Sequence, residues 1–64
     1  MTEISSYAIA KYNYEPQRPD ELPLQRGDNV LVVERSSDGW WKGEYNGQTG
    51  WFPSNVSILY FFVL

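Results

Sequence analysis

The chain has 64 residues, a formal net charge of −3, 17% aromatic residues, and neither cysteine nor histidine. A chain of this length forms one small domain, and the missing cysteine and histidine exclude a disulfide scaffold and a Cys/His zinc site. The negative charge argues against a nucleic-acid partner, because phosphate binding requires clustered Lys and Arg. The polar, acidic N-terminus lacks the basic and apolar regions of a secretory signal. We therefore expect a cytoplasmic protein without a metal or another cofactor.

Residues 7–12 (YAIAKY) predict a first β-strand. Alternation along this strand places Tyr12 on the same face as Ala8 and Ala10. The next segment, residues 13–26, is rich in Pro, Asp, Glu and Gln and is too long for a tight turn. It predicts a long, folded-over loop whose return arm contributes leucines to the core.

Three further strands follow at short intervals. Residues 30–35 are β-branched and apolar, which favours a strand. Residues 40–45 and 48–52 predict a hairpin, because the Asn-Gly pair between them suits a type I′ turn, which needs positive φ at both central positions. Pro53 ends the second arm of the hairpin. Short strands separated by Gly, Pro and Asn turns predict a small barrel or sandwich.

The C-terminal residues 58–64 are apolar apart from one hydroxyl. They are too few to span a bilayer, which takes about 20 residues. An uncharged segment of β-formers is prone to self-pairing unless it is covered. Two alternatives follow: the segment closes the barrel as a last strand, or it pairs between copies or occludes a binding groove in a self-associating domain.

Four segments resemble the signature motifs of SH3 domains, in the family's order and at its spacing. These are AKYNY at 10–14, DELPLQRGD at 20–28, GWWKG at 39–43 and GWFPSN at 50–55, and together they extend the likeness over residues 7–57. The run 37–55 is most similar to the second SH3 domain of Nck-type adaptors, and SH3 domains of PIX-type exchange factors resemble it nearly as well.

The resemblance implies an all-β fold, a small five-stranded barrel with a long first loop (RT-like) and a short 3₁₀ turn before the last strand. It implies a domain over residues 7–59, with an N-terminal tail at 1–6 and an apolar extension of the last strand, or tail, at 60–64. It further implies a non-catalytic module of the kind found in signalling adaptors. Such a module binds proline-rich Pro-x-x-Pro segments that carry a basic residue.

Recognition of a polyproline II ligand requires flat, rigid aromatic walls between which its ridges of proline rings can lie. By resemblance, Tyr12 and Tyr14 line the proline pockets, and Trp40, Pro53 and Asn55 complete the second one. Because adjacent residues on a strand face opposite sides, only one tryptophan of the pair at 40–41 can meet the ligand. The resemblance assigns the other, Trp41, to a structural role.

A ligand arginine requires a carboxylate and favours an indole face beside it. The resemblance assigns this contact to Glu21, next to Trp40. Two other acidic residues of the long loop, Glu15 and Asp20, would tune the field of the site and the association rate. Asp38, which flanks the second loop, is also expected at the peptide-binding site. The alternative is that these are solvated loop charges. Trp51 either extends the groove at its specificity end or caps exposed sheet.

The expected core contains seven apolar residues: Ala8, Ala10, Leu22, Leu24, Val30, Val32 and Phe52. The resemblance places Gly43 beside this core, where only a small residue fits. An enzyme is not expected, because no nucleophile is assembled with a base and the adjacent carboxylates of Asp20 and Glu21 would point apart on an extended segment.

The family pattern breaks after Asn55, where SH3 domains usually have Tyr-Val and this chain has Val56-Ser57. Either Val56 replaces the tyrosine and Ser57 enters a usually buried position, or one residue is deleted and Val56 keeps its position in the core. Burial of an unpartnered hydroxyl costs about 1–3 kcal/mol, which favours the deletion, although a deletion would distort the 3₁₀ turn. In both cases a groove wall is lost. We therefore expect weaker peptide binding than in a version with Tyr inserted after Asn55.

Overall fold

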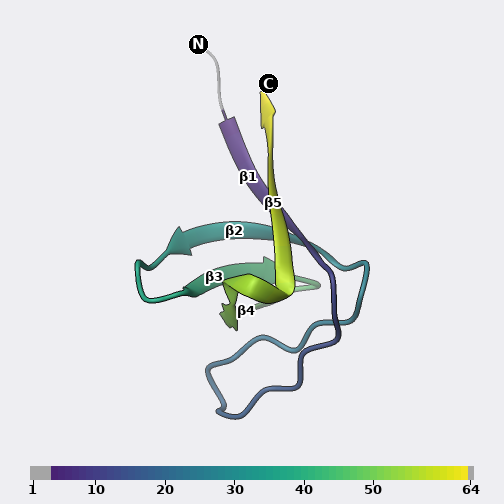
Figure 1. Cartoon of the computed structure of the whole chain (residues 1–64), viewed down its shortest axis with the longest axis vertical. Coiled ribbons are helices and arrows are strands. Elements are labelled where there is room, and N and C mark those ends of the chain that lie inside the picture. The colour runs from purple at the N-terminus through teal and green to yellow at the C-terminus, as the bar shows by residue number, and fades with distance from the viewer. Residues whose placement is uncertain (1–3, 64) are drawn as a thin grey trace.

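The computed structural model describes residues 4–63 of the chain, with the side chains of residues 6–58. Five strands and one 3₁₀ turn follow one another as β1 (Ile4–Ala10), β2 (Asn29–Arg35), β3 (Trp40–Tyr45), β4 (Gln48–Pro53), η1 (Ser54–Val56) and β5 (Ser57–Val63). Neighbouring strands are antiparallel in a strongly bent sheet of order β4-β3-β2-β1-β5 (Figure 1). The all-β fold class, the five strands and the 3₁₀ turn before the last strand are confirmed.

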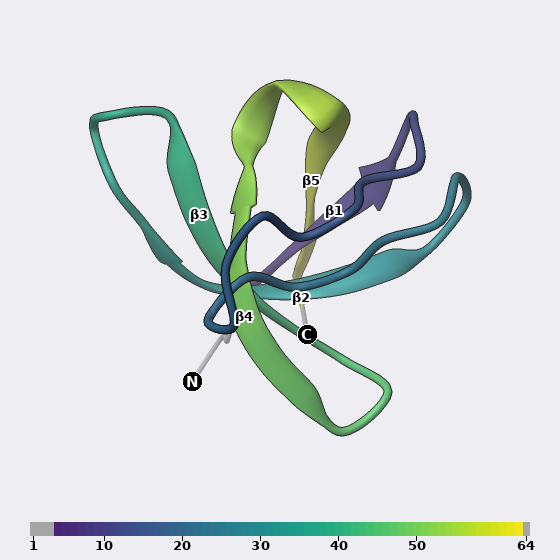
Figure 2. The same ribbon diagram turned by 90° about the horizontal axis from the view of Figure 1, so that it is seen from below.

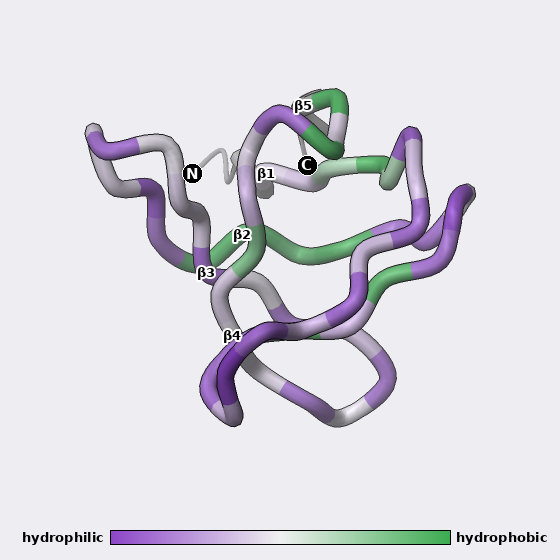
Figure 3. Tube along the Cα trace, turned by 60° about the horizontal axis from the view of Figure 1, so that its bottom comes forward, coloured by the Kyte–Doolittle hydropathy of each residue, from purple (hydrophilic) through white to green (hydrophobic). Residues whose placement is uncertain are grey.

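The core contains all seven apolar residues predicted from the sequence, each at most 9% exposed. Figure 3 shows the hydrophobic stretch along β2 and the hydrophilic residues along the loops. Gly43 lies against this core, because a Cβ at that position would come within 2.8 Å of the Phe52 ring and still closer to Val30. Tyr12 differs from the prediction: it is 61% exposed, since β1 ends at Ala10 and the alternation does not continue to Tyr12.

The hairpin between β3 and β4 turns at the predicted Asn-Gly pair. Asn46 has φ of 53° and Gly47 has φ of 79°, so both central residues adopt the left-handed conformation that a type I′ turn requires. The turn fixes the register, in which Trp40 lies opposite Pro53 and Gly43 opposite Gly50. This register places Trp40 and Pro53 side by side on one face.

Residues 11–28, called the long loop below, fold back on themselves and across the edge of β4 (Figure 2). Tyr14 and Leu24 exchange two backbone hydrogen bonds of 2.8 and 3.1 Å. At the tip, the Leu22 N–H donates to the Trp51 carbonyl at 2.8 Å, and the Trp51 N–H donates to the Asp20 carbonyl at 2.9 Å. The loop therefore covers the free edge of β4.

The first and last strands pair along their whole described length. The register runs from Ile4 opposite Val63 to Ala10 opposite Ser57, and the two strands project from the rest of the molecule as a ribbon (Figure 1). β1 thus begins at Ile4, inside the expected tail 1–6, and β5 continues through residues 60–63. The C-terminal segment pairs within its own chain, while residues 1–3 and 64 lie outside the described part.

Candidate peptide-binding groove

The 3₁₀ turn η1 joins the two halves of the candidate site. The Ser54 N–H donates to the Gly39 carbonyl at 2.8 Å, which ties the turn to the residue before Trp40. At its other end the Val56 carbonyl accepts from the Lys11 N–H at 2.7 Å, next to Tyr12. The turn is therefore bonded to the Lys11–Tyr12 segment at one end and to the Gly39–Trp40 segment at the other.

The turn keeps three residues, Ser54–Val56, and Ser57 begins β5. The Ser57 hydroxyl donates to the Ser54 carbonyl at 3.1 Å, and Val56 is half-buried against the core. The desolvation cost that favoured a deletion does not arise, because the hydroxyl has a partner. The hydroxyl therefore gives no reason to prefer a deletion, and the packing of Val56 against the core is what the deletion interpretation expects.

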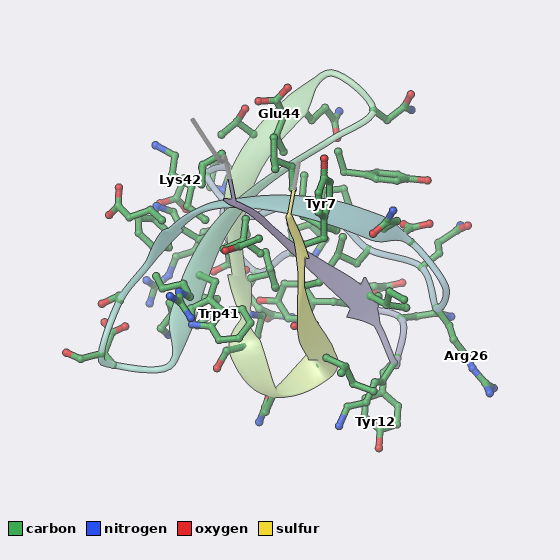
Figure 4. All side chains as sticks on the ribbon, turned by 90° about the horizontal axis from the view of Figure 1, so that it is seen from above. Tyr7, Tyr12, Arg26, Trp41, Lys42 and Glu44 are labelled. Carbon is green, nitrogen blue, oxygen red and sulfur yellow. The ribbon has the colours of Figure 1, made fainter. Side chains whose placement is uncertain are left out.

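The two groove tyrosines differ in their surroundings. Tyr12 is exposed and points outward beyond the end of β1 (Figure 4), with the Lys11 ammonium 5.8 Å from its ring centroid. Tyr14 is half-buried, and its hydroxyl donates to Glu21 Oε1 at 2.5 Å. Burial, and secondly the hydrogen bond to this carboxylate, raise the pKa of Tyr14 to about 12.

Glu21 is the one charged residue of the described side chains that is classed as buried, with 8% of its surface exposed. Its Oε1 accepts hydrogen bonds from the Tyr14 hydroxyl and, at 2.7 Å, from the Gln17 N–H. The Tyr14 bond first, then the Gln17 bond, hold the pKa of the Glu21 carboxyl below its usual value despite burial. The carboxylate is therefore ionised at neutral pH and fixed in position.

Beside η1, the long loop and the loop between β2 and β3 enclose a cleft of about 370 Å³, called the acidic cleft below. Its lining residues are Arg18, Asp20, Glu21, Ser36, Asp38, Trp40 and Trp51. The Trp40 N–H donates to Asp38 Oδ1 at 3.2 Å, which orients that carboxylate. Three acidic side chains and two indoles thus share one concave surface, the combination that suits a guanidinium or ammonium group.

The tryptophans divide as the strand alternation requires. Trp40 and Trp51 lie on the outer face and line the acidic cleft, and the Lys42 ammonium is 6.0 Å from the Trp51 ring centroid. Trp41 faces the other way and packs edge-on against Phe52, with ring centroids 6.3 Å apart. Trp51 therefore lines the same cleft as Trp40, whereas Trp41 packs against the core.

Glu15 does not join the other three acidic residues. It lines a different cleft, of about 690 Å³, together with Tyr14 and Tyr45 on another side of the long loop. Conversely, Arg18 and Ser36 line the acidic cleft although the sequence did not single them out. No sequence signal identifies these two, because their position depends on how two loops meet. Pro53 is half-buried beside Trp40, and Asn55 is exposed on η1.

Within residues 4–63 there is no group of three or more His, Cys, Asp or Glu side chains that could hold a metal ion, and no helix suited to crossing a membrane.

Comparisons with known proteins agree with this geometry. The SH3 domain family model matches residues 9–54. Over 50 residues the chain is 54% identical to the SH2/SH3 adapter protein dreadlocks of Drosophila melanogaster, covering 78% of this chain and 9% of that protein. Over 58 residues it is 48% identical to Rho guanine nucleotide exchange factor 7 of Homo sapiens, covering 86% of this chain and 7% of that protein.

A solved structure has the same fold. The C-terminal SH3 domain of myosin IB from Entamoeba histolytica, bound to EhFP10(GEF) peptide, has a TM-score of 0.84 and 38% identity, covering 88% of this chain and 83% of that chain. These findings confirm the predicted likeness to Nck-type adaptors and PIX-type exchange factors. The chain spans only 9% and 7% of the two curated relatives. By its family match, sequence identity and fold, the chain belongs to the SH3 domain family.

Proposed function

We propose that this domain binds an extended, proline-rich segment of another protein, with a basic residue of that segment held in the acidic cleft. SH3 domains are non-catalytic modules, and one solved relative is described as bound to a peptide. The single observation that carries the proposal for this chain is the acidic cleft itself. It places carboxylates and indoles at the Trp40 end of η1, whose other end is bonded to Lys11, next to Tyr12.

A polyproline II helix presents a ridge every three residues and is already extended, so it loses little conformational entropy on binding. In the proposed complex its proline rings lie between Tyr12 and η1, and between Pro53 and Trp40. The Asn55 amide and the Trp40 indole N–H supply hydrogen-bond donors for its carbonyl groups. The basic side chain then enters the acidic cleft, where Glu21 is held ionised by its two donors.

The proposal is tested by fluorescence titration with a Pro-x-x-Pro-x-Arg peptide. Control peptides replace the Arg by Gln, or both prolines by Ala. We expect saturable binding of the first peptide and a loss of about tenfold or more for each control, because buried aromatic and charged contacts dominate such interfaces. Equal affinity for all three peptides would contradict recognition of a proline-rich, basic segment.

A matched pair of variants locates the site. Trp40→Ala removes a wall of the proposed groove, whereas Trp41→Ala removes a neighbouring indole that packs on Phe52. We expect W40A to lose most peptide affinity with little change in stability, and W41A to lower the unfolding free energy by about 1–3 kcal/mol while the folded fraction still binds. The reverse pattern would place the ligand on the other face.

A signalling adaptor or exchange factor is the proposed setting, since both kinds of relative contain such a domain. Cytoplasmic location stays a prediction from the sequence. The alternative function, a self-associating domain whose tail pairs between copies or occludes the groove, is not supported. β5 pairs with β1 of the same chain through Val63, in a ribbon that projects away from η1.

A further inference from the structure

Arg18 is a cation among the acidic side chains of the acidic cleft. The turn that carries it is closed by a hydrogen bond of 3.2 Å from the Glu21 N–H to the Arg18 carbonyl. Pro19 occupies the second position of this turn, where its fixed φ is favoured. The backbone of Arg18 is therefore anchored beside Glu21, while its side chain is exposed at the edge of the cleft.

The Arg18 guanidinium is not engaged in a contact within the described part of the domain. Among the described side chains it has no hydrogen bond or ion pair, although its charge acts on both Glu21 and Tyr14. It lines the acidic cleft on one side and, on the other, a cleft of about 470 Å³ that also contains Pro19 and Pro23. Its five N–H donors therefore stand at the boundary between two hollows and are available to a ligand.

This placement has opposite effects on two kinds of ligand. A peptide whose only charged group is basic meets the attraction of three acidic side chains and also the repulsion of Arg18. In a peptide with a carboxylate next to its basic residue, that carboxylate can form a charge-assisted contact with Arg18, because guanidinium binds carboxylate in a planar, two-point geometry. The contact offsets the repulsion between Arg18 and the basic residue. The resulting specificity is the difference between the affinity for the peptide with the acidic residue and the affinity for the peptide without it.

We propose that Arg18 is a specificity-determining residue that makes the domain prefer proline-rich ligands in which an acidic residue adjoins the basic one. The inference rests on the proposed function and names the ligand class of the same site more narrowly. Asp20, Glu21 and Asp38 bind the basic group, and Arg18 binds the acidic group at the edge of the cleft. The domain then recognises two adjacent ligand residues of opposite charge rather than a single basic residue.

The test is a double-mutant cycle between protein and peptide at low ionic strength. The neutral peptide is Pro-x-x-Pro-x-Arg with Ala on both sides of the Arg, and two acidic peptides replace one or the other Ala by Glu. The proteins are the wild type, Arg18→Gln and the control Arg26→Gln. R26Q removes the same charge from the turn before β2, where the Arg26 side chain points outward (Figure 4).

We expect the wild type to bind the better acidic peptide about two- to fivefold more tightly than the neutral one, the range of exposed ion pairs. R18Q should lose this preference and bind the neutral peptide more tightly than the wild type, while R26Q should keep the preference. An unchanged preference in R18Q, or none in the wild type, would overturn the inference and leave the proposed function intact. Absence of binding by all three proteins to every peptide would instead overturn the proposed function, and the inference with it.

Discussion

The hydroxyl of Tyr14 donates a 2.5 Å hydrogen bond to the Glu21 carboxylate, so a tyrosine of the proposed groove and an acid of the acidic cleft form one unit. The two residues are seven positions apart in the long loop, and the Gln17 N–H between them donates to the same oxygen. The bond therefore fixes the loop conformation and the position of the charge together. Stability and ligand recognition should depend on it jointly.

The stability of the domain at alkaline pH should depend on the Tyr14 hydroxyl. The pKa of Tyr14 is raised from 10.0 to about 12, so the folded state favours the protonated hydroxyl. This contribution to stability is complete below pH 10 and is lost as pH rises through about 12. We expect the unfolding free energy of the wild type to fall more steeply above pH 10 than that of Tyr14→Phe. Denaturant titrations check this, with Tyr12→Phe as the matched variant; a Y14F profile as steep as the wild-type profile would contradict it.

The stability of the domain at acidic pH should depend on the Glu21 carboxylate. The Glu21 pKa is lowered in the folded state, chiefly by the Tyr14 bond, so ionisation of Glu21 stabilises the fold above its ordinary pKa of 4.5. This contribution disappears as pH falls through the lower, folded value. The wild type should therefore lose stability below pH 4.5 more than Glu21→Gln does. Glu15→Gln removes the same charge from the same loop, and its profile should follow the wild type more closely than that of E21Q.

Replacement of Val56 should restore a wall of the proposed groove. Val56 is the third residue of η1, so Val56→Tyr adds a ring without lengthening the turn or shifting the β1–β5 register. We expect V56Y to bind a Pro-x-x-Pro-x-Arg peptide about fivefold or more tightly than the wild type, the scale of a productive aromatic contact. Insertion of Tyr after Asn55 should gain less, because it moves Val56 out of the turn. Equal affinities of V56Y and wild type in a calorimetric titration would show that a tyrosine ring at position 56 does not contribute to peptide binding.

Gly50 should be intolerant of a side chain. A Cβ there would lie 2.9 Å from the Leu22 nitrogen and 3.0 Å from the Asp20 carbonyl oxygen, so the long loop would have to move away from β4. We expect Gly50→Ala to destabilise the domain by about 1–3 kcal/mol, the usual cost of overpacking.

G50A should also weaken peptide binding, because the same loop carries two acids of the acidic cleft. Thr49→Ala, at an exposed position of the same strand, should change stability by less than about 0.5 kcal/mol. A G50A variant that matches T49A in thermal unfolding and in peptide affinity would contradict the close approach.

The sequence predicted best what depends on local alternation and turn chemistry. The seven core residues follow from period-two patterns, and the hairpin follows from one Asn-Gly pair. It predicted less well where distant segments meet. Three features depend on the path of the 18-residue long loop, which no periodicity specifies. They are the contact of the loop with Trp51, the burial of Glu21 under the Tyr14 hydroxyl and the position of Arg18 in the lining of the acidic cleft.

The Val56-Ser57 break illustrates the same limit. The argument for a deletion assumed that the Ser57 hydroxyl had no partner, and the partner is the Ser54 carbonyl three residues earlier. A local hydrogen bond of this kind is common for serine near turns, yet it depends on the turn being formed. For the tail, the sequence left two alternatives open, and the structure shows β5 paired with β1 of the same chain.

The most direct test of the proposed function is chemical-shift mapping of the whole domain during titration with a Pro-x-x-Pro-x-Arg peptide. We predict saturable shifts at the Trp40 and Trp51 indoles, at the Asn55 amide and around Tyr12, with none at the Trp41 indole. Saturable shifts confined to the β1–β5 ribbon, or no shifts at millimolar peptide, would contradict binding in the groove between Tyr12 and the acidic cleft.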